Sequence, residues 1–174
     1  MAANRNLVAG APRIKEAQDS VTRPNNTTAY TAGDAMSDNA TTATAAGAFT
    51  LDFEGLHQGG LTLLDFTMHK SDQDQANCDI FVLLFTTLPA VAGWEDNAAS
   101  AITDAEMLEC KGVVKFDADD WCNCGTGDVQ TVPKPIGIVC ASGTTTIYGI
   151  MIAGAAYEPG ASEVFTLTAH AIQD

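Results

Sequence analysis

The densest group of side chains that could do chemistry lies between residues 117 and 128. This stretch carries five oxygen-bearing side chains, Asp117, Asp119, Asp120, Asn123 and Asp128. Calcium takes six to eight oxygen ligands, so a loop of this kind could hold it. The residue order is not that of an EF-hand loop, because the glycine and the distal glutamate are misplaced. A solvated acidic loop is the favoured interpretation, and no metal or cofactor is predicted.

Five cysteines offer a second kind of chemistry, zinc binding or disulfide formation. They are Cys78, Cys110, Cys122, Cys124 and Cys140. Structural zinc sites use two ligand pairs with about two to four residues inside a pair, whereas Cys122 and Cys124 are separated by one residue and the other thiols stand singly. A zinc site completed by Cys110 or a histidine is the alternative. An odd count without a secretory signal favours free thiols, most of them buried.

Groupings typical of enzymes are not found in the sequence. There is no Gly-x-Ser-x-Gly, no His-Glu-x-x-His and no phosphate-binding loop. The three histidines, His57, His69 and His170, are far apart in the chain, and each is predicted to be a surface or edge residue. We therefore predict that the protein is not an enzyme.

Two tryptophans could bind sugars. Trp94 and Trp121 stand beside acidic residues, and an exposed indole can stack on a sugar ring. This makes a carbohydrate-binding module an alternative function. The favoured interpretation is that each tryptophan closes one end of a β-sandwich, with its ring buried.

The elements that would position these residues are mostly strands. Residues 48–56 alternate with a period of two and place Phe49, Leu51 and Phe53 on one face. After a turn at residues 57–60, residues 61–70 predict a second strand that forms a hairpin with the first. Residues 78–87 are apolar on both faces, which predicts a strand covered on both sides.

The second half of the chain predicts one helix among further strands. Thr103 precedes Glu106 by three residues, which is the capping-box spacing, so a short helix is expected at residues 104–109. Strands are expected at residues 112–117, 129–140, 144–157 and 163–172. Short strands with regularly spaced turns predict an all-β fold, an antiparallel β-sandwich that is jelly-roll-like, with one short helix and an extended N-terminal arm.

Charge divides the chain and limits its partners. The 174 residues include 22 acidic and 8 basic ones, a net charge of −14, which disfavours nucleic acid as a partner. No apolar run approaches the roughly 20 residues that span a bilayer, so a soluble protein without a membrane partner is expected. Residues 1–23 hold four of the basic residues and only two acidic ones. We predict an arm at residues 1–38 and a β-sandwich domain at residues 39–174.

A series of short stretches, in this order and spacing, resembles a family of small structural proteins of tailed bacteriophages, the head decoration or cement proteins. The stretches are Val21-Thr22-Arg23-Pro24, Thr27-Thr28-Ala29-Tyr30, Ala32-Gly33-Asp34, Gly59-Gly60, Leu83-Leu84-Phe85 with Pro89, Asp96-Asn97-Ala98-Ala99, Asp104-Ala105-Glu106-Met107-Leu108, Gly112-Val113-Val114-Lys115-Phe116, Tyr148-Gly149, Ala156-Tyr157 and Glu163-Val164-Phe165-Thr166. The resemblance implies a non-enzymatic shell component of the virion, assembled in the host cytoplasm and bound outside the head to the major capsid protein. Copies would associate as homo-oligomers, for example as trimers at local threefold positions.

The arm is predicted to bind the partner. Its extended segment could add as a strand to the sheet edge of a neighbour, with the side chain of Tyr30 in a pocket. The predicted contact residues are Arg13, Lys15, Val21, Arg23, Pro24 and Tyr30. One alternative is that this segment is the first edge strand of its own domain. Another virion role, in a tail or fibre, is the alternative function within the particle.

Overall fold

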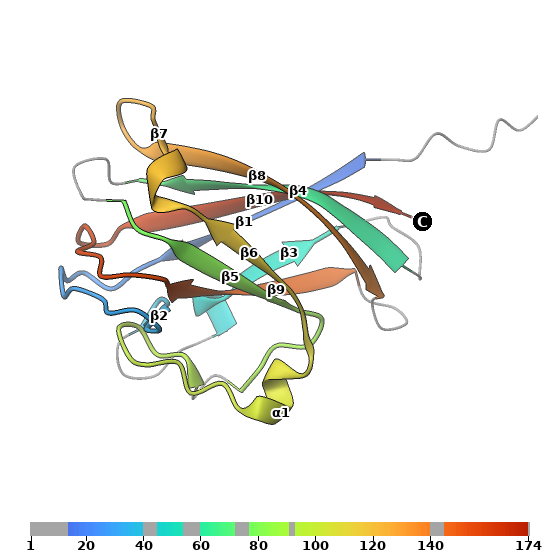
Figure 1. Ribbon diagram of the computed structural model, residues 1–174, viewed down its shortest axis with the longest axis horizontal. Coiled ribbons are helices and arrows are strands. Elements are labelled where there is room, and N and C mark those ends of the chain that lie inside the picture. Colours follow the sequence, from blue (N-terminus) through green and yellow to red (C-terminus); the bar gives the residue numbers. More distant parts are fainter. Residues whose placement is uncertain are drawn as a thin grey trace, which may run out of the picture.

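The computed structural model describes residues 14–39, 45–53, 60–71, 77–90, 93–139 and 145–173. Figure 1 shows two layers of strands facing each other, with the single short α-helix at one end. The strands are β1 (Ile14–Thr22), β2 (Ala35–Met36), β3 (Phe49–Asp52), β4 (Gly60–Lys70), β5 (Ile80–Phe85), β6 (Cys110–Phe116), β7 (Cys122–Asn123), β8 (Asp128–Val139), β9 (Thr146–Ala153) and β10 (Val164–Gln173). The helical turns are η1 (Ala45–Gly47), α1 (Asp104–Met107) and η3 (Ala118–Asp120). None of the described helices is long and apolar enough to cross a membrane.

The strand order is that of a jelly roll. The first sheet runs β1-β10-β4-β8-β7, and the second runs β2-β9-β5-β6, with β3 also paired to β9. All described pairs are antiparallel, and four of them are nested: β1 with β10, β3 with β9, β4 with β8 and β5 with β6. The chain is thus one long hairpin that wraps into two sheets, which confirms the predicted fold class.

The nesting corrects the predicted pairing of consecutive strands. The strands expected at residues 48–56 and 61–70 exist as β3 and β4, but they lie in different sheets and form no hairpin. A local turn signal describes only where the chain reverses, whereas pairing in a jelly roll joins strands that are far apart in sequence. For the same reason β9 and β10 follow each other in the chain without pairing.

The core lies between the two sheets. The alternation expected in β3 is present, with Phe49, Leu51 and Phe53 fully buried, and Phe165 and Leu167 of β10 are fully buried as well. Val82 and Leu84 of β5 point into the same core. Burying this many large apolar side chains supplies the main driving force for folding, at about 25 cal/mol for each Å² removed from water.

A second, smaller apolar cluster covers part of the outer face of the second sheet. Its centre is Trp94, whose ring is completely buried against Phe85 and Ile150. The chain between β5 and α1 therefore folds back over the sheet at the C-terminal end of β5. The predicted burial of the Trp94 ring is confirmed, and it excludes the stacking of a sugar there, but the ring lies on the outer face of a sheet and not at an end of the sandwich.

The helix α1 begins where the capping box predicted it. The Thr103 side chain accepts a hydrogen bond from the backbone N–H of Glu106, and the Glu106 carboxylate accepts one from the backbone N–H of Thr103. Glu106 also accepts a hydrogen bond from Ala90 at 2.7 Å, which fixes the helix to the preceding segment. The Thr103 hydroxyl donates to the same carboxylate. Together, the two backbone N–H groups and this hydroxyl hold the pKa of Glu106 below its usual value.

The segment from residue 14 to residue 36 belongs to the same sandwich. Strand β1 pairs with β10 along its whole length, from Ile14 opposite Ile172 to Thr22 opposite Val164. Strand β2 pairs with β9, and Tyr30 forms an isolated bridge with Tyr157. The boundary predicted after residue 38 therefore does not coincide with a break in the packing, because β1 provides an edge strand of this domain, as the alternative interpretation had it.

Candidate binding surface

An apolar surface remains open on the outer face of β5 and β6. Phe81 and Leu83 point outward from β5, opposite Lys115 and Val113 of β6. Both β5 side chains are only half-buried, and Val113 is 39% exposed. The prediction that this strand is covered on both sides thus holds for Phe85, beneath Trp94, holds in part for Leu83, which packs against the Trp94 cluster, and fails for Phe81. We call Phe81, Leu83, Val113 and their lysine neighbours Lys111 and Lys115 the β5–β6 face.

Ion pairs border this face. Lys115 pairs with Asp79 at 2.9 Å and with Asp117 at 2.7 Å, and Lys111 pairs with Glu109 at 3.0 Å. Hydrogen bonds from the Lys115 ammonium lower the pKa of both Asp79 and Asp117. All these side chains are partly exposed, so each pair contributes little to the free energy of folding. Their main effect is electrostatic: the two lysines offset most of the negative charge of the three neighbouring carboxylates.

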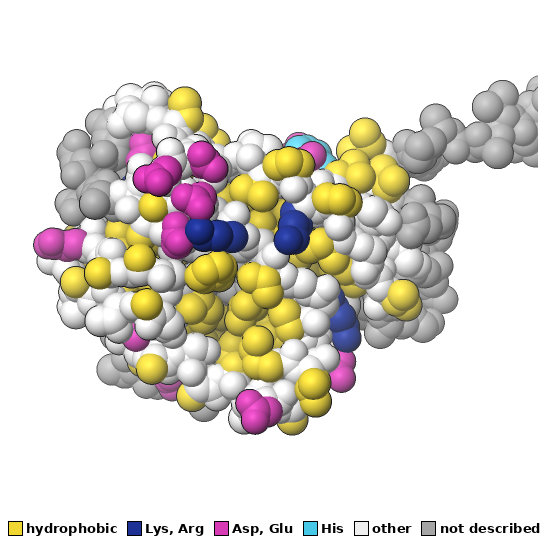
Figure 2. Space-filling model, in the orientation of Figure 1, with side chains coloured by type: hydrophobic (Ala, Val, Ile, Leu, Met, Phe, Trp, Pro, Cys, Tyr) yellow, Lys and Arg dark blue, Asp and Glu magenta, His cyan; other side chains and the backbone are white. Residues whose placement is uncertain are grey.

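The β5–β6 face is therefore unusual in a protein with a net charge of −14. After residue 23 the sequence holds only four basic residues: Lys70, which is buried, and three lysines on β6 and β8. Figure 2 shows hydrophobic side chains gathered over the middle of this side of the molecule, with lysine side chains along their margin. An apolar centre with a polar, charge-balanced rim is typical of protein–protein interfaces.

The neighbouring edge strand β8 is protected against pairing. Pro133 and Pro135 flank the exposed Lys134, and proline cannot donate a backbone hydrogen bond to an added strand. The two sheets meet closely here: a Cβ atom added to Gly112 of β6 would lie 2.8 Å from Cδ1 of Ile136. A partner would accordingly find the backbone of β8 protected between residues 133 and 135 and would meet side chains there.

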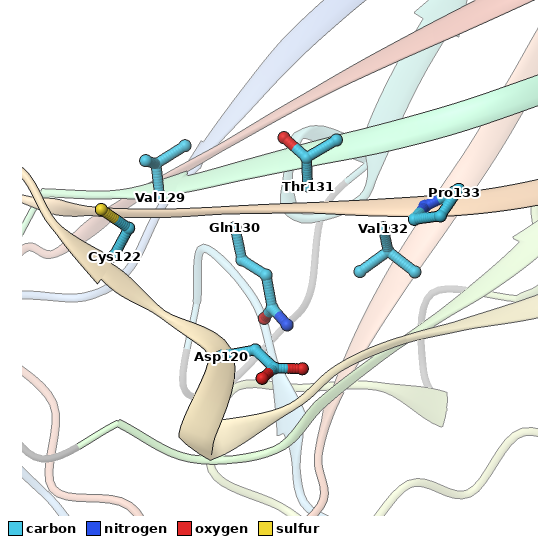
Figure 3. A pocket seen from close by; sticks show the side chains of 7 residues that line it. All are labelled: Asp120, Cys122, Val129, Gln130, Thr131, Val132 and Pro133. Atoms are coloured by element: carbon cyan, nitrogen blue, oxygen red, sulfur yellow. The ribbon is translucent and has the colours of Figure 1, made fainter.

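A hollow of about 470 Å³ lies between β8 and the turn η3. Figure 3 shows Asp120, Gln130 and Val132 directed into it, while Val129 and Thr131 point to the other side of β8. The Gln130 side-chain oxygen has no hydrogen-bond partner among the described residues. The hollow is open, and Asp120, Cys122 and Gln130 contribute a carboxylate, a thiol and an amide to its lining.

The acidic loop does not bring its oxygens together. Asp117 pairs with Lys115 and caps η3, whereas Asp128 pairs with the buried Lys70. No three residues of the types that ligate metals form a group within the described ranges. Of the thiols, Cys78, Cys110, Cys122 and Cys124 are free, and Cys140 lies outside the described residues. Free thiols were expected, and of the four described ones Cys78 is buried, Cys110 is half-buried, and Cys122 and Cys124 are exposed.

The contact residues predicted in the N-terminal segment differ in how deeply they are buried. Val21, Arg23 and Tyr30 are buried in the chain's own core. Lys15 and Pro24 are half-buried. Arg13 lies outside the described residues.

Arg23 and Tyr30 form a buried polar network with Asp96. The Arg23 guanidinium donates hydrogen bonds to the Tyr30 hydroxyl, to an Asp96 carboxylate oxygen at 3.2 Å and to the Gly160 carbonyl at 3.3 Å. The Tyr30 hydroxyl in turn donates to Asp96. Burial raises the pKa of Tyr30 far above its usual range, so the hydroxyl stays protonated. These two side chains hold the N-terminal segment onto the body, and partner contact stays a prediction for Lys15 and Pro24.

The sequence missed the β5–β6 face as a site. The signal was present, because Phe81 and Leu83 make residues 78–87 apolar on both faces. Only the structure shows how far along β5 the segment around Trp94 covers the outer face of the sheet. His170, predicted to be a surface or edge residue, lies on the outer face of the first sheet between two carboxylates that the sequence did not bring together, Asp65 at 2.6 Å and Glu16 at 3.2 Å.

Comparisons with known proteins give distant structural likeness only. No protein-family model matches the chain, and no curated protein matches it. Among solved structures, the chain is similar to a protein of the native virion of Kashmir bee virus at neutral pH, with 7% identity over 94% of this chain and 71% of that one, and a TM-score of 0.38. It is also similar to a chain of the Israeli acute paralysis virus full particle heated to 63 degrees, with 11% identity over 100% of this chain and 79% of that one, and a TM-score of 0.36. At TM-scores this low the likeness assigns neither fold nor function to this chain.

Proposed function

We propose that this protein is a non-enzymatic structural component of a virus particle. The observation that carries the proposal is the nested pairing of β1 with β10, β3 with β9, β4 with β8 and β5 with β6. This jelly roll occurs in viral shell proteins, in lectins and in cupins, so the choice among these depends on the residues that the fold presents.

The residues present favour a shell component over the other two classes. A cupin carries a metal inside its sandwich, but here the space between the sheets is filled by side chains such as Phe66, Met68 and Phe116. A lectin-type site on tryptophan needs an open ring face. Trp94 is buried, and the Trp121 ring lies between Phe116, 6.1 Å away between centroids, and the Lys70 ammonium at 6.0 Å.

The more specific proposal is a decoration protein bound to the outside of a tailed-bacteriophage head. The sequence resemblance supports it, and so does the charge: an acidic body is tolerated outside a shell, away from packaged DNA. In this role the protein performs no reaction. It adds interface area between neighbouring capsid subunits, and a standard interface buries roughly 1,600 Å².

The β5–β6 face is the proposed contact with the shell, and its occupant is a neighbouring capsid subunit. Long-range repulsion between two acidic surfaces is weakest where lysines already balance the local charge, as Lys111 and Lys115 do here. Phe81, Leu83 and Val113 supply the apolar centre. The edge strand β1 is the second proposed contact, near Lys15, for copies of this chain that associate as homo-oligomers.

Sedimentation with purified particles tests the function. The full chain is mixed with DNA-free heads and with tails of the same virus, and bound protein is measured in the pellet. Saturable binding to heads at a fixed ratio to the capsid protein is the expected result. Binding to tails alone would favour the tail or fibre role, and binding to neither would overturn the virion role.

A further inference from the structure

Lys70 and Asp128 form an ion pair inside the sandwich. They occupy directly opposite positions on the neighbouring strands β4 and β8. The Lys70 Nζ atom lies 3.3 Å from Asp128 Oδ2, and the two side chains are 1% and 3% exposed. Two unit charges have therefore been removed from water at this place, which is costly unless every polar atom is satisfied.

The surroundings of this pair are largely aromatic. The Lys70 ammonium lies 5.7 Å from the centroid of the Tyr157 ring and 6.0 Å from that of Trp121. Asp128 Oδ1 finds no hydrogen-bond donor among the described residues, and neither does the Trp121 indole N–H find an acceptor there. The carboxylate is thus held against an amine in an apolar enclosure without being fully hydrogen-bonded.

A second carboxyl group belongs to the same cluster. Glu163 is 2% exposed and accepts a hydrogen bond from the Tyr157 hydroxyl at 2.6 Å. Burial raises the pKa of the neighbouring Cys78 thiol to about 12, with Lys70 lowering it and Glu163 raising it by their charges. Tyr157 contacts both groups, because its ring lies under the Lys70 ammonium and its hydroxyl donates to Glu163. Glu163 is therefore the candidate proton carrier of this cluster.

We propose that Lys70 and Asp128 become joined by an amide bond after the chain has folded. Proton transfer from the ammonium, through Glu163, leaves a free amine and a protonated carboxyl group. The Lys70 Nζ lone pair then attacks Asp128 Cγ, and Nζ gives up a second proton, again through Glu163, to the hydroxyl oxygen on Cγ. The bond from Cγ to that oxygen breaks, and the oxygen leaves as water. The lost water contains both transferred protons, no electrons are gained or lost, and no co-reactant is needed.

Position and solvent both favour this condensation. The fold holds the Lys70 amine 3.3 Å from an oxygen of the carboxyl group that it would attack, and well-positioned reacting groups behave as if present at effective concentrations of about 10⁵ M or more. The product is a neutral amide in place of two buried charges, which removes the desolvation penalty of the ion pair. The apolar enclosure also keeps bulk water from reversing the reaction. The bond would tie the two central long strands of the first sheet together covalently.

Mass spectrometry of the intact wild-type protein tests the proposal directly. The folded full chain is incubated until its mass stops changing, and Lys70→Arg, which cannot form the bond, serves as the reference for all other processing. The wild-type protein should be lighter than its own sequence predicts by one water molecule, while Lys70→Arg keeps its full mass. Proteolysis should then release a branched peptide that contains Lys70 and Asp128. A constant wild-type mass without this loss, or a loss located elsewhere, would overturn the proposal.

The Glu163→Gln variant tests the proton carrier. It keeps the size of the side chain and its ability to accept from Tyr157, and the rate of water loss should fall on the order of a hundredfold. Circular dichroism shows whether the variant is folded, and only the folded fraction is analysed by mass. Conversion of that fraction at the wild-type rate would remove Glu163 from the mechanism, even if the bond itself is found.

Discussion

Arg23 and Asp96 form an ion pair of 3.2 Å in which both side chains are completely buried. The pair joins the end of β1 to the segment that covers the second sheet, so it connects the N-terminal part of the chain to the body. Breaking such a pair leaves one charge unsatisfied in the interior. We expect Arg23→Met or Asp96→Asn to lower the free energy of unfolding by about 3–5 kcal/mol, measured by urea denaturation.

The exposed pair of Lys111 with Glu109 is the matched control for that measurement. Lys111→Met removes one partner of an ion pair of similar length at the surface, and its expected cost is below about 1 kcal/mol. Equal losses for the buried and the exposed pair would show that Arg23 does not hold the N-terminal segment in place.

His170 predicts how stability depends on pH. Hydrogen bonding to Asp65 and, to a lesser extent, Glu16 raises the pKa of His170 above its ordinary value of 6.5. Below this ordinary value the imidazolium contributes its full stabilisation. The contribution is lost as the pH rises through the raised pKa of the folded protein. His170→Gln should therefore cost more stability at about pH 6 than at about pH 9, as measured by thermal unfolding at both values.

The exposed His69 provides the comparison. It lies on β4 in the same sheet and makes no ion pair among the described residues, so His69→Gln, measured at the same two pH values, controls for the loss of an imidazole as such. A pH-independent cost for His170→Gln would contradict the assignment of the charged cluster.

The capping box makes a local prediction. Thr103→Ala removes the hydroxyl that accepts from the Glu106 backbone and donates to the Glu106 carboxylate. A loss of about 1 kcal/mol in the free energy of unfolding is expected from chemical denaturation. Thr126→Ala, at an exposed loop position, should leave stability unchanged within about 0.5 kcal/mol. A loss no greater than this in Thr103→Ala would mean that α1 is fixed by other contacts.

The cysteines should differ in their reactivity towards iodoacetamide. Cys122 and Cys124 are exposed, whereas Cys78 is buried and burial raises its pKa to about 12. Because the thiolate is the reactive form, peptide mapping of briefly treated native protein should find label on Cys122 or Cys124 and none on Cys78. Labelling of Cys78 at a similar rate would show that the cluster around Lys70 opens to solvent.

A charge placed in the β5–β6 face should prevent docking. Val113→Asp puts a carboxylate at the centre of this face, where it would have to be desolvated on binding. We expect at least a tenfold weaker association with heads by sedimentation, since 1.4 kcal/mol corresponds to a factor of ten. Val139→Asp makes the same change at a 79% exposed position of the other sheet and should bind normally. An equal loss of binding to heads in both variants would show that the contact lies elsewhere on the protein.

The sequence predicted local features well and long-range pairing poorly. The period-two pattern around Phe49 and the Thr103–Glu106 spacing depend on neighbours within one element, and both are confirmed. The pairing of β3 with β9 depends on residues about a hundred positions apart, which no local turn reports.

The N-terminal segment shows the same limit. The polar stretch around Tyr30 gave no hint that Arg23 and Asp96 would meet, because a buried ion pair is defined by partners and not by composition. The β5–β6 face could be predicted only in part, since apolar residues on both sides of a strand do not show how far a covering loop extends.

Imaging of the assembled particle tests the central claim most directly. A reconstruction at moderate resolution of intact particles, compared with particles that lack this protein, should show additional density of the size of one jelly roll on the outer head surface, repeated with the symmetry of the shell. The same maps should place the side of the molecule that carries Val113 towards the capsid subunits. Identical maps with and without the protein, or its absence from purified particles, would contradict the account.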